Sequence, residues 1–337
     1  FNMCRPLELV FSNGVDKGAQ ISIKTGNVED MTTFEEFYNA YKAQETYMIG
    51  LMVNAINAID TAHSERVPLP FLSCMVEDCV KEGKTVQEGG AHYNFTGPQG
   101  FGIANMADGL WAVKTLVFDE KKVTMAELKD ALIHNYGQGL SPKAAKNATQ
   151  EVVINLAKVG KSVTESQVAD ICRMFLTGEQ DPTKRKRYEE ILDMINELPK
   201  YGNDIEEIDM LARDVANIYA KELEKHKNHR GGMFQAGLYP VSANVPLGEQ
   251  TGATPDGRLA NTPIADGVGQ RQGADTKGPT AAANSVAKLE HGRASNGTLY
   301  NQKFHPSALS GNAGLQNFAS YIRAFFDQKG MHMQFNV

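Results

Sequence analysis

Cysteine is scarce in this sequence, and its scarcity excludes two kinds of protein. The 337 residues contain four cysteines, Cys4, Cys74, Cys79 and Cys172. This number is too small for a disulfide-stabilised secreted scaffold, and no two of them have the CxxC spacing that binds zinc or an iron–sulfur cluster. We therefore expect four buried free thiols, since unpaired cysteine is among the most buried residue types.

Long apolar runs and concentrated positive charge are also missing. No apolar stretch approaches the roughly 20 residues that cross a bilayer, and the opening FNMCRPLELVF carries no basic leader or small-residue cleavage site. The 34 Lys and Arg are outnumbered by 40 Asp and Glu, and both signs are spread along the chain. Nucleic-acid binding needs a concentration of basic residues. We expect a cytoplasmic protein with neither a membrane nor a nucleic acid as partner.

Helical signals dominate the first two thirds of the chain. Two capping boxes, Thr33 with Glu36 and Thr124 with Glu127, predict the starts of two helices. Apolar residues recur at helical spacing over residues 34–59, which predicts one long helix. Helical periodicity also covers residues 162–177, 183–197 and 204–227. The middle of the chain is therefore predicted to be a helical layer.

Short β-compatible runs separated by Gly, Pro, Asn and Asp follow His229. At the end of the chain Met331, Met333, Phe335 and Val337 alternate with polar residues, which is the period of a strand with one buried face. Helices that alternate with short strands indicate an α/β architecture. We expect a single domain over the whole chain, because α/β barrels reach such lengths as one unit.

The stretch GLYPVSANVPLG is one candidate binding segment. In strand conformation Tyr239, Val241 and Ala243 share one face, and Ser242 and Asn244 share the other. Hydroxyl and amide groups on such a strand could bind a small polyhydroxylated substrate. A solvated strand face explains the same pattern, so both interpretations stay open at this point.

A second candidate is GGAHYNF, where Gly89 and Gly90 permit an unusual backbone path beside His92, Tyr93 and Asn94. A tight turn whose polar side chains bond to the backbone is the favoured interpretation. His92 has no second His or carboxylate at ligand spacing, so we expect no metal site.

Two further residues and one glycine-rich stretch have ordinary interpretations. Arg258 follows the turn signal ATPDG and could clamp an anion, but a structural ion pair is the commoner arrangement. His305 precedes Pro306 and favours a turn over a catalytic base. GVGQRQGAD lacks both the P-loop Lys-Ser/Thr and the GxGxxG spacing, so we expect no nucleotide site.

Several stretches in order resemble the glycyl radical enzymes, the pyruvate formate-lyase-like superfamily. They are EGGAHYNFTGPQGFGIAN, PKYGND, SANVPLGEQTGATPDGR, GADTKGPTAAANSVAKL, NGTLYNQKFHPSAL and MHMQFN. The resemblance implies a ten-stranded α/β barrel of two five-stranded halves wrapped by helices, of which this chain would hold much of the second half. The helical stretch at about 138–197 is longer than the family pattern, and we interpret it as an insertion.

The resemblance also implies a radical stored on a glycine and passed to a cysteine thiyl, which takes a hydrogen atom from substrate in a closed lumen. A separate radical-SAM activating enzyme would install the glycyl radical, and a homodimer is expected, with no B12 and no metal in this chain. None of the four cysteines matches the family's GCVE-type loop, and no RVxGY-type loop is present. We therefore expect an internal fragment, inactive by itself, whose thiyl cysteine and radical glycine lie elsewhere.

Within the family, GGAHYNFTGPQGFGIAN and GLYPVSANVPLG look most similar to the B12-independent glycerol and propane-1,2-diol dehydratases. On that pattern the enzyme eliminates water from a small diol to leave an aldehyde. Tyr239 and Ser242 would line the lumen with Asn244 behind them. A sulfonate-cleaving relative would need an Arg near Tyr239, and none is there. The alternatives are a formate-lyase-like carbon–carbon lyase, a carbon–nitrogen lyase, and a non-catalytic fragment or subunit.

Overall fold

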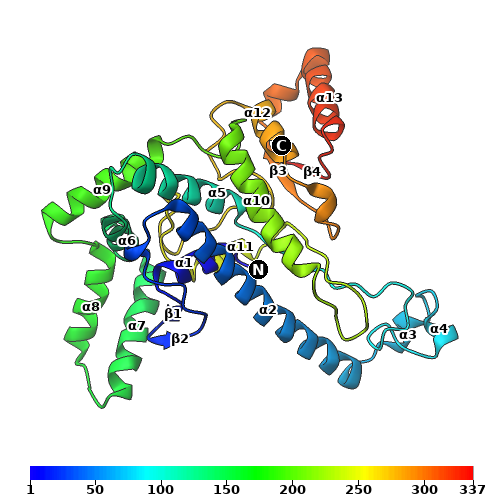
Figure 1. Ribbon diagram of the computed structural model, residues 1–337, viewed down its shortest axis with the longest axis horizontal. Helices are drawn as coiled ribbons and strands as arrows, with labels where there is room; N and C mark the ends of the chain where they lie inside the picture. The colour runs from blue at the N-terminus through cyan, green and yellow to red at the C-terminus, as the bar shows by residue number, and fades with distance from the viewer. Residues whose placement is uncertain (337) are drawn as a thin grey trace.

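The computed structural model describes residues 1–336, and most of them are helical (Figure 1). The helices are α1 (Cys4–Phe11), α2 (Phe34–Arg66), α3 (Pro70–Ser73), α4 (Cys79–Glu82), α5 (Ile103–Ala112), α6 (Met125–Ile133), α7 (Pro142–Lys158), α8 (Glu165–Thr177), α9 (Pro182–Glu197), α10 (Glu206–Leu223), α11 (Asn244–Gly248), α12 (Pro279–Ala287) and α13 (Gly311–Asp327). The strands are β1 (Val15–Asp16), β2 (Ala19–Gln20), β3 (Tyr300–Lys303) and β4 (Met333–Asn336). The helical layer predicted for the middle of the chain is confirmed.

The two predicted capping boxes set helix starts. The Thr33 hydroxyl accepts a hydrogen bond from the backbone nitrogen of Glu36 at 3.2 Å, and the Glu36 carboxylate accepts one from the Thr33 backbone nitrogen at 3.1 Å. Thr124 and Glu127 make the same reciprocal pair at the start of α6. Each box satisfies backbone donors that the first helical turn leaves free.

Five segments far apart in the sequence lie side by side and run parallel. Their order is 1–3, 96–101, 233–238, 297–303 and 333–336. The first three joins are isolated bridges: Asn2 to Phe101 in the first, Thr96 to Phe234 and Gln99 to Gly237 in the second, and Leu238 to Thr298 in the third. The last join is the regular pairing of β3 with β4. Every crossover contains at least one helix, as parallel neighbours require.

This parallel array has two unlike faces. Phe234, Ala236 and Leu238 alternate along one segment and are buried in the main core. Gln235 and Tyr239 alternate with them and are only half-buried. The helices therefore cover one face, and the polar residues occupy the other. The α/β character of the fold is confirmed, while the residues described here form an open array and not a closed barrel.

The predicted strand over Tyr239–Asn244 is wrong. The segment ends at Tyr239, residues 241–243 form a turn, and α11 begins at Asn244. Pro240 has no backbone N–H to donate to a ladder, and Val241 has φ +56°, outside the extended region. The alternation of side chains in this stretch therefore does not represent two strand faces.

The closing strand is confirmed as β4, whose Met333 and Phe335 are half-buried and whose Gln334 and Asn336 are exposed. Val337, which was predicted to extend it, lies outside the described residues. Helix α13 covers one side of β3 and β4 through edge-on aromatic contacts of Phe335 with Phe318 and with Tyr321.

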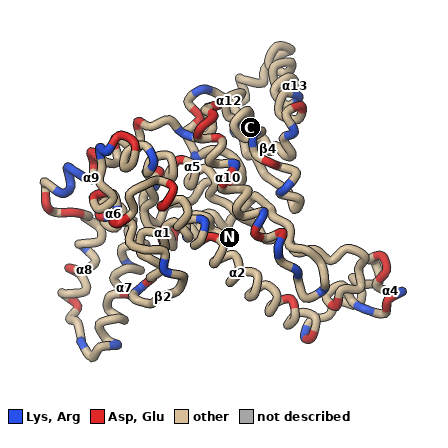
Figure 2. The backbone as a smooth tube through the Cα atoms, in the orientation of Figure 1, with Lys and Arg blue, Asp and Glu red and all other residues tan. Residues whose placement is uncertain are grey.

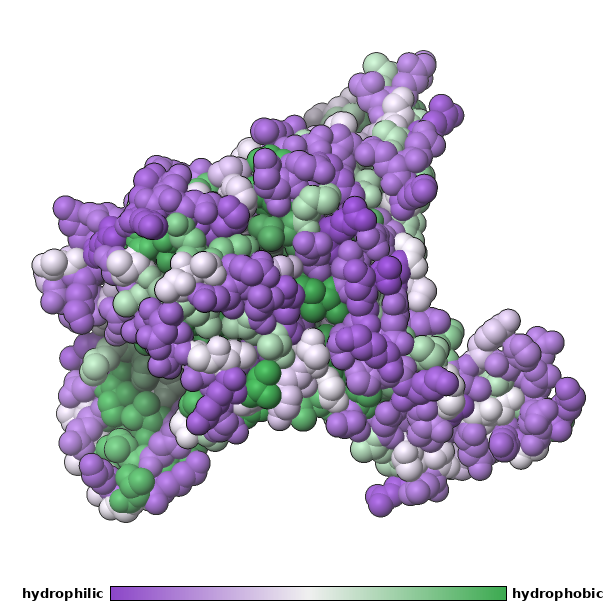
Figure 3. Space-filling model, in the orientation of Figure 1, coloured by the Kyte–Doolittle hydropathy of each residue, from purple (hydrophilic) through white to green (hydrophobic). Residues whose placement is uncertain are grey.

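Residues 138–197 form α7, α8 and α9. Helices α7 and α8 make a hairpin that extends away from the rest of the chain, and α9 packs beside α6 (Figure 1). Large apolar side chains on the hairpin are exposed, with Val159 and Met174 each 68% accessible. Apolar surface lines a hollow in the same region of Figure 3. That this stretch is an insertion stays a prediction.

The cysteines are free, but the expectation that all are buried is wrong. Cys4 and Cys79 are buried, Cys172 is partly exposed and Cys74 is exposed. Cys74 directly follows the short helix α3, which lies beyond the end of α2 and away from the core (Figure 1). Basic and acidic residues are interspersed along the backbone (Figure 2). Among the described helices, none is long and apolar enough to span a bilayer. The cytoplasmic location stays a prediction.

Candidate functional site

The carboxyl end of the central segment of the array carries the predicted site residues. Parallel α/β sheets place binding and catalytic groups just beyond the carboxyl ends of their strands. Leu238 makes the last bridge of its segment, and Tyr239 follows it directly. Ser242 and Asn244 come next, in the turn that leads into α11. The structure thus groups all three in one connection, although not on a strand.

The three side chains have different surroundings. The half-buried Tyr239 accepts a hydrogen bond at its hydroxyl oxygen from Asn296 Nδ2 at 3.2 Å. Asn244 donates from Nδ2 to the backbone carbonyl oxygen of Ile264 at 3.0 Å, while the backbone carbonyl oxygen of Asn244 accepts from the Ile264 nitrogen at 3.2 Å. Ser242 is exposed. Asn244 therefore anchors the turn, which leaves the hydroxyls of Tyr239 and Ser242 as the groups available to a ligand.

A row of neutral amides lies on the same face of the array as Tyr239. Side chains of paired residues in parallel segments lie on the same face. The pairings of Gln99 with Gly237 and of Asn301 with Gln334 therefore determine which face these side chains occupy. The row comprises Gln99, Gln235, Asn301, Gln334 and Asn336, all half-buried or exposed. Amides both donate and accept hydrogen bonds without carrying charge, which suits hydroxyl-bearing ligands.

The amide row was missed at the level of sequence. Its members belong to four separate segments, so no local stretch shows them together. The alternation of Gln334 and Asn336 with apolar residues was visible, but only the pairing with β3 brings Asn301 beside them.

A cleft of about 450 Å³ lies beside this row and includes Asn244, Asp266 and Gln270 in its lining. Asp266 connects it to the array, because its carboxylate accepts a hydrogen bond from the Asn301 side chain. Arg271 also lines the cleft and reaches the fully buried Asp256 behind it, with 2.8 Å between Arg271 Nη1 and Asp256 Oδ2.

Arg258 is neither an anion clamp nor an ion-pair partner. Its guanidinium donates to backbone carbonyls, including those of Thr262 at 2.8 Å and Leu259 at 3.1 Å. No carboxylate within residues 1–336 forms a salt bridge with it. Arg258 therefore stabilises the loop that follows the ATPDG turn, where five N–H donors match several carbonyls.

The GGAHYNF stretch behaves as a turn at the surface. Asn94 donates from Nδ2 to the Ala91 carbonyl at 2.7 Å, and Tyr93 is largely exposed. His92 pairs with Asp78, at 3.2 Å from Nδ1 to the carboxylate. Among residues 1–336, no three His, Cys, Asp or Glu side chains are grouped as ligands of a metal ion would be. Likewise His305 accepts at Nδ1 from the Ser307 nitrogen at 3.3 Å and caps a short turn, as predicted.

The PKYGND stretch has a structural role. Asp108 on α5 is fully buried and accepts a hydrogen bond from the Tyr201 backbone nitrogen at 2.7 Å. Burial raises the pKa of Asp108 to about 7, although the nearby positive charge of Lys200 acts in the opposite direction. Burial lowers the pKa of Lys200. These groups join α5 to the loop before α10.

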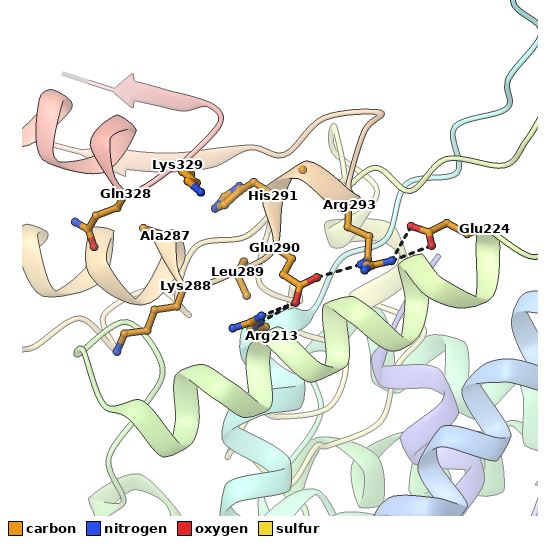
Figure 4. A pocket seen from close by; sticks show the side chains of 11 residues that line it. Arg213, Glu224, Ala287, Lys288, Leu289, Glu290, His291, Arg293, Gln328 and Lys329 are labelled. Carbon is orange, nitrogen blue, oxygen red and sulfur yellow. Dashed lines mark hydrogen bonds and ion pairs between the residues drawn. The ribbon is translucent and has the colours of Figure 1, made fainter.

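Another groove, of about 710 Å³, lies elsewhere, between α10, α12 and the end of α13 (Figure 4). Its two arginines are already paired, Arg213 with Glu290 at 2.5 Å and Arg293 with Glu224 at 2.9 Å. His291 bonds through its two ring nitrogens to Thr298 and the Val286 carbonyl. The groove is therefore lined by ion pairs that hold helices together.

The match with known families decides the identity. Residues 1–248 match the family described as Pyruvate formate lyase-like, and residues 264–337 match the one described as Glycine radical. The chain belongs to the pyruvate formate lyase-like family. The resemblance to glycyl radical enzymes is thereby confirmed.

Solved structures of this family include close relatives of the chain. A Roseburia inulinivorans protein studied for 1,2-propanediol dehydration is 61% identical, with a TM-score of 0.92 over 100% of this chain and 40% of its own. The glycerol-bound B12-independent glycerol dehydratase from Clostridium butyricum is 49% identical, with a TM-score of 0.83 over 100% of this chain and 37% of its own.

More distant members have other named substrates. The trans-4-hydroxy-L-proline dehydratase of Clostridioides difficile is 34% identical over 100% of this chain and 37% of its own length. The (2S)-3-sulfopropanediol dehydratase of Klebsiella oxytoca is 32% identical over 100% of the chain and 36% of its own length. The chain thus spans little more than a third of the relatives it matches.

Proposed function

We propose that the protein to which this chain belongs is a glycyl radical dehydratase of a small vicinal diol, such as propane-1,2-diol or glycerol. The observation that carries the proposal is the 61% identity to a protein studied for 1,2-propanediol dehydration. The reaction eliminates water from the diol and leaves an aldehyde. The glycyl radical supplies, by way of a cysteine thiyl, the hydrogen-atom abstraction that starts it, and we infer that a radical-SAM activating enzyme installs that radical.

The chemistry of the candidate site supports a neutral substrate. The face of the array that carries Tyr239 presents mainly hydroxyl and amide groups, with Lys303 beside Asn336 as a charged exception. The tyrosine at its centre is bonded to an amide and not to a charged residue. An amino acid or a sulfonate brings charges that require ionic partners when water is excluded. A diol needs only hydrogen bonds, which Tyr239 and Ser242 can supply while Asn244 holds their turn in place.

The parallel array supports the proposal of a barrel wall. Five parallel segments with helices on one face and polar groups on the other have the organisation of half of an α/β barrel. We propose that the polar face is the lumen wall of a ten-stranded barrel whose other half belongs to the remaining part of the protein. A homodimer is proposed on family resemblance alone.

A substrate screen of the full-length protein tests the function. The protein would be activated without oxygen by its activating enzyme and given propane-1,2-diol, glycerol, trans-4-hydroxyproline, choline and pyruvate in turn, without B12. We expect propanal from propane-1,2-diol or 3-hydroxypropanal from glycerol. Turnover of hydroxyproline, choline or pyruvate without any diol turnover would contradict the proposal. A protein that shows no radical signal after activation would favour a non-catalytic subunit.

A further inference from the structure

Asn296 lies directly behind Tyr239 in a space that two glycines leave open. Its Nδ2 donates to the Gly97 carbonyl at 2.9 Å and to the Tyr239 hydroxyl oxygen at 3.2 Å. A Cβ added at Gly97 would lie 2.2 Å from the Asn296 side chain, and one added at Gly237 would lie 2.9 Å from its nitrogen. The Asn296 side chain therefore fits in this space because residues 97 and 237 are both glycine.

The orientation of the Asn296 amide follows from its partners. A carbonyl oxygen can only accept, so the NH₂ group and not the oxygen of Asn296 must face Gly97. The second hydrogen of the same NH₂ group is directed at Tyr239. The phenol oxygen is thus the acceptor in this contact, and its own proton remains free for another partner.

We propose that Asn296 is a positioning residue that presents the Tyr239 hydroxyl as a hydrogen-bond donor to one oxygen of the diol, an inference that rests on the proposed function. The phenol ring is half-buried at the carboxyl end of its segment, and Gly97, Gly237 and Asn296 occupy the space behind it. A donor held in this way fixes which hydroxyl of the diol it binds. A bound substrate that is displaced by even a small distance reacts much more slowly.

A double-mutant cycle in the activated full-length enzyme tests the inference. The variants are Asn296→Asp, Tyr239→Phe and the pair together. Asp has nearly the shape of Asn, but its ionised carboxylate only accepts hydrogen bonds. The Tyr239 hydroxyl would therefore donate its hydrogen bond to this carboxylate and not to the substrate. We expect Asn296→Asp to lower kcat/KM for propane-1,2-diol by about tenfold or more, and to lower it by less than about twofold when Tyr239 is already Phe.

The same cycle separates positioning from support of the fold. If Asn296 only holds Gly97 in place, its replacement lowers activity equally in both backgrounds, and that result would overturn the inference while the proposed function stands. Asn296→Ala gives the same comparison if the Asp variant does not fold. A wild-type enzyme without diol turnover overturns the proposed function before any variant is measured, so the two failures are distinguishable.

Discussion

Arg271 and Asp256 form an ion pair that joins the ATPDG turn to the cleft beside the amide row. Arg271 Nη1 lies 2.8 Å from Asp256 Oδ2 and 2.6 Å from the Asp256 carbonyl oxygen, and the Asp256 side chain is fully buried. Asn105 on α5 donates to the same carboxylate at 2.7 Å. One carboxylate therefore fixes the position of a turn, a helix and a cleft-lining loop.

Removal of this carboxylate is predicted to destabilise the protein strongly. Asp256→Ala leaves Arg271 without its partner in a largely buried site, and the expected loss is about 3 kcal/mol in the free energy of unfolding. Chemical denaturation measures this loss. Asp327→Ala removes an exposed carboxylate at the end of α13 and is the matched control. Equal stability of the two variants would contradict the importance of the pair.

Loss of the Thr33 capping box is predicted to lower the stability of the protein by a smaller amount. Thr33→Ala removes the hydroxyl that accepts from the Glu36 nitrogen and should cost about 1 kcal/mol. Thr33→Ser keeps a hydroxyl at the same place and should retain most of the stability. Thermal denaturation of the three proteins checks the order, and a Ser variant as unstable as Ala would argue against the cap.

Two glycines give a matched pair of predictions near the array. Gly267 has φ +52°, and a Cβ there would lie 2.0 Å from the Leu299 carbonyl oxygen, whereas a Cβ at Gly292 has no neighbour within 4 Å. Gly267→Ala should therefore destabilise the protein by at least about 1–2 kcal/mol. Gly292→Ala should be nearly neutral. Denaturation curves that coincide for the two variants would contradict the close approach at Leu299.

The buried Glu45 on α2 predicts a pH dependence of stability. Burial raises the pKa of Glu45 from its ordinary value of 4.5 to about 8. Between these values the folded state binds more protons than the unfolded state, so this group makes stability fall as pH rises, by at most about 1.4 kcal/mol per pH unit.

Glu45→Gln removes that titration, so its stability relative to wild type should increase between pH 5 and pH 8. The exposed Glu82→Gln is the control and should show no such trend. Denaturation at several pH values makes the comparison. A constant difference between Glu45→Gln and wild type across this range would show that the carboxyl is ionised in the folded protein throughout.

The sequence allowed the local elements to be predicted better than their assembly. Capping boxes and helical periodicity predicted α2 and α6 because they depend on neighbours three or four residues apart. The parallel array was not located from the residues, because most of its joins are isolated bridges between segments far apart in the chain. Its polar amides are recognised as one row only when the pairing of those segments is known.

The alternation of side chains predicted one strand correctly and another wrongly. At the chain end it correctly predicted β4, where no proline interrupts the pattern. At GLYPVSAN the same pattern misled, because Pro240 and the left-handed Val241 turn the chain out of the array. Tyr239 and Ser242 still reach one connection, since the turn that breaks the strand also places them at its carboxyl end.

The most direct measurement is the structure of the full-length protein with propane-1,2-diol bound. We predict that the diol lies in an enclosed barrel against the amide face of the array, with one oxygen within hydrogen-bond distance of the Tyr239 hydroxyl. A diol bound elsewhere, or Tyr239 and Ser242 on an outer surface of the complete protein, would contradict the account.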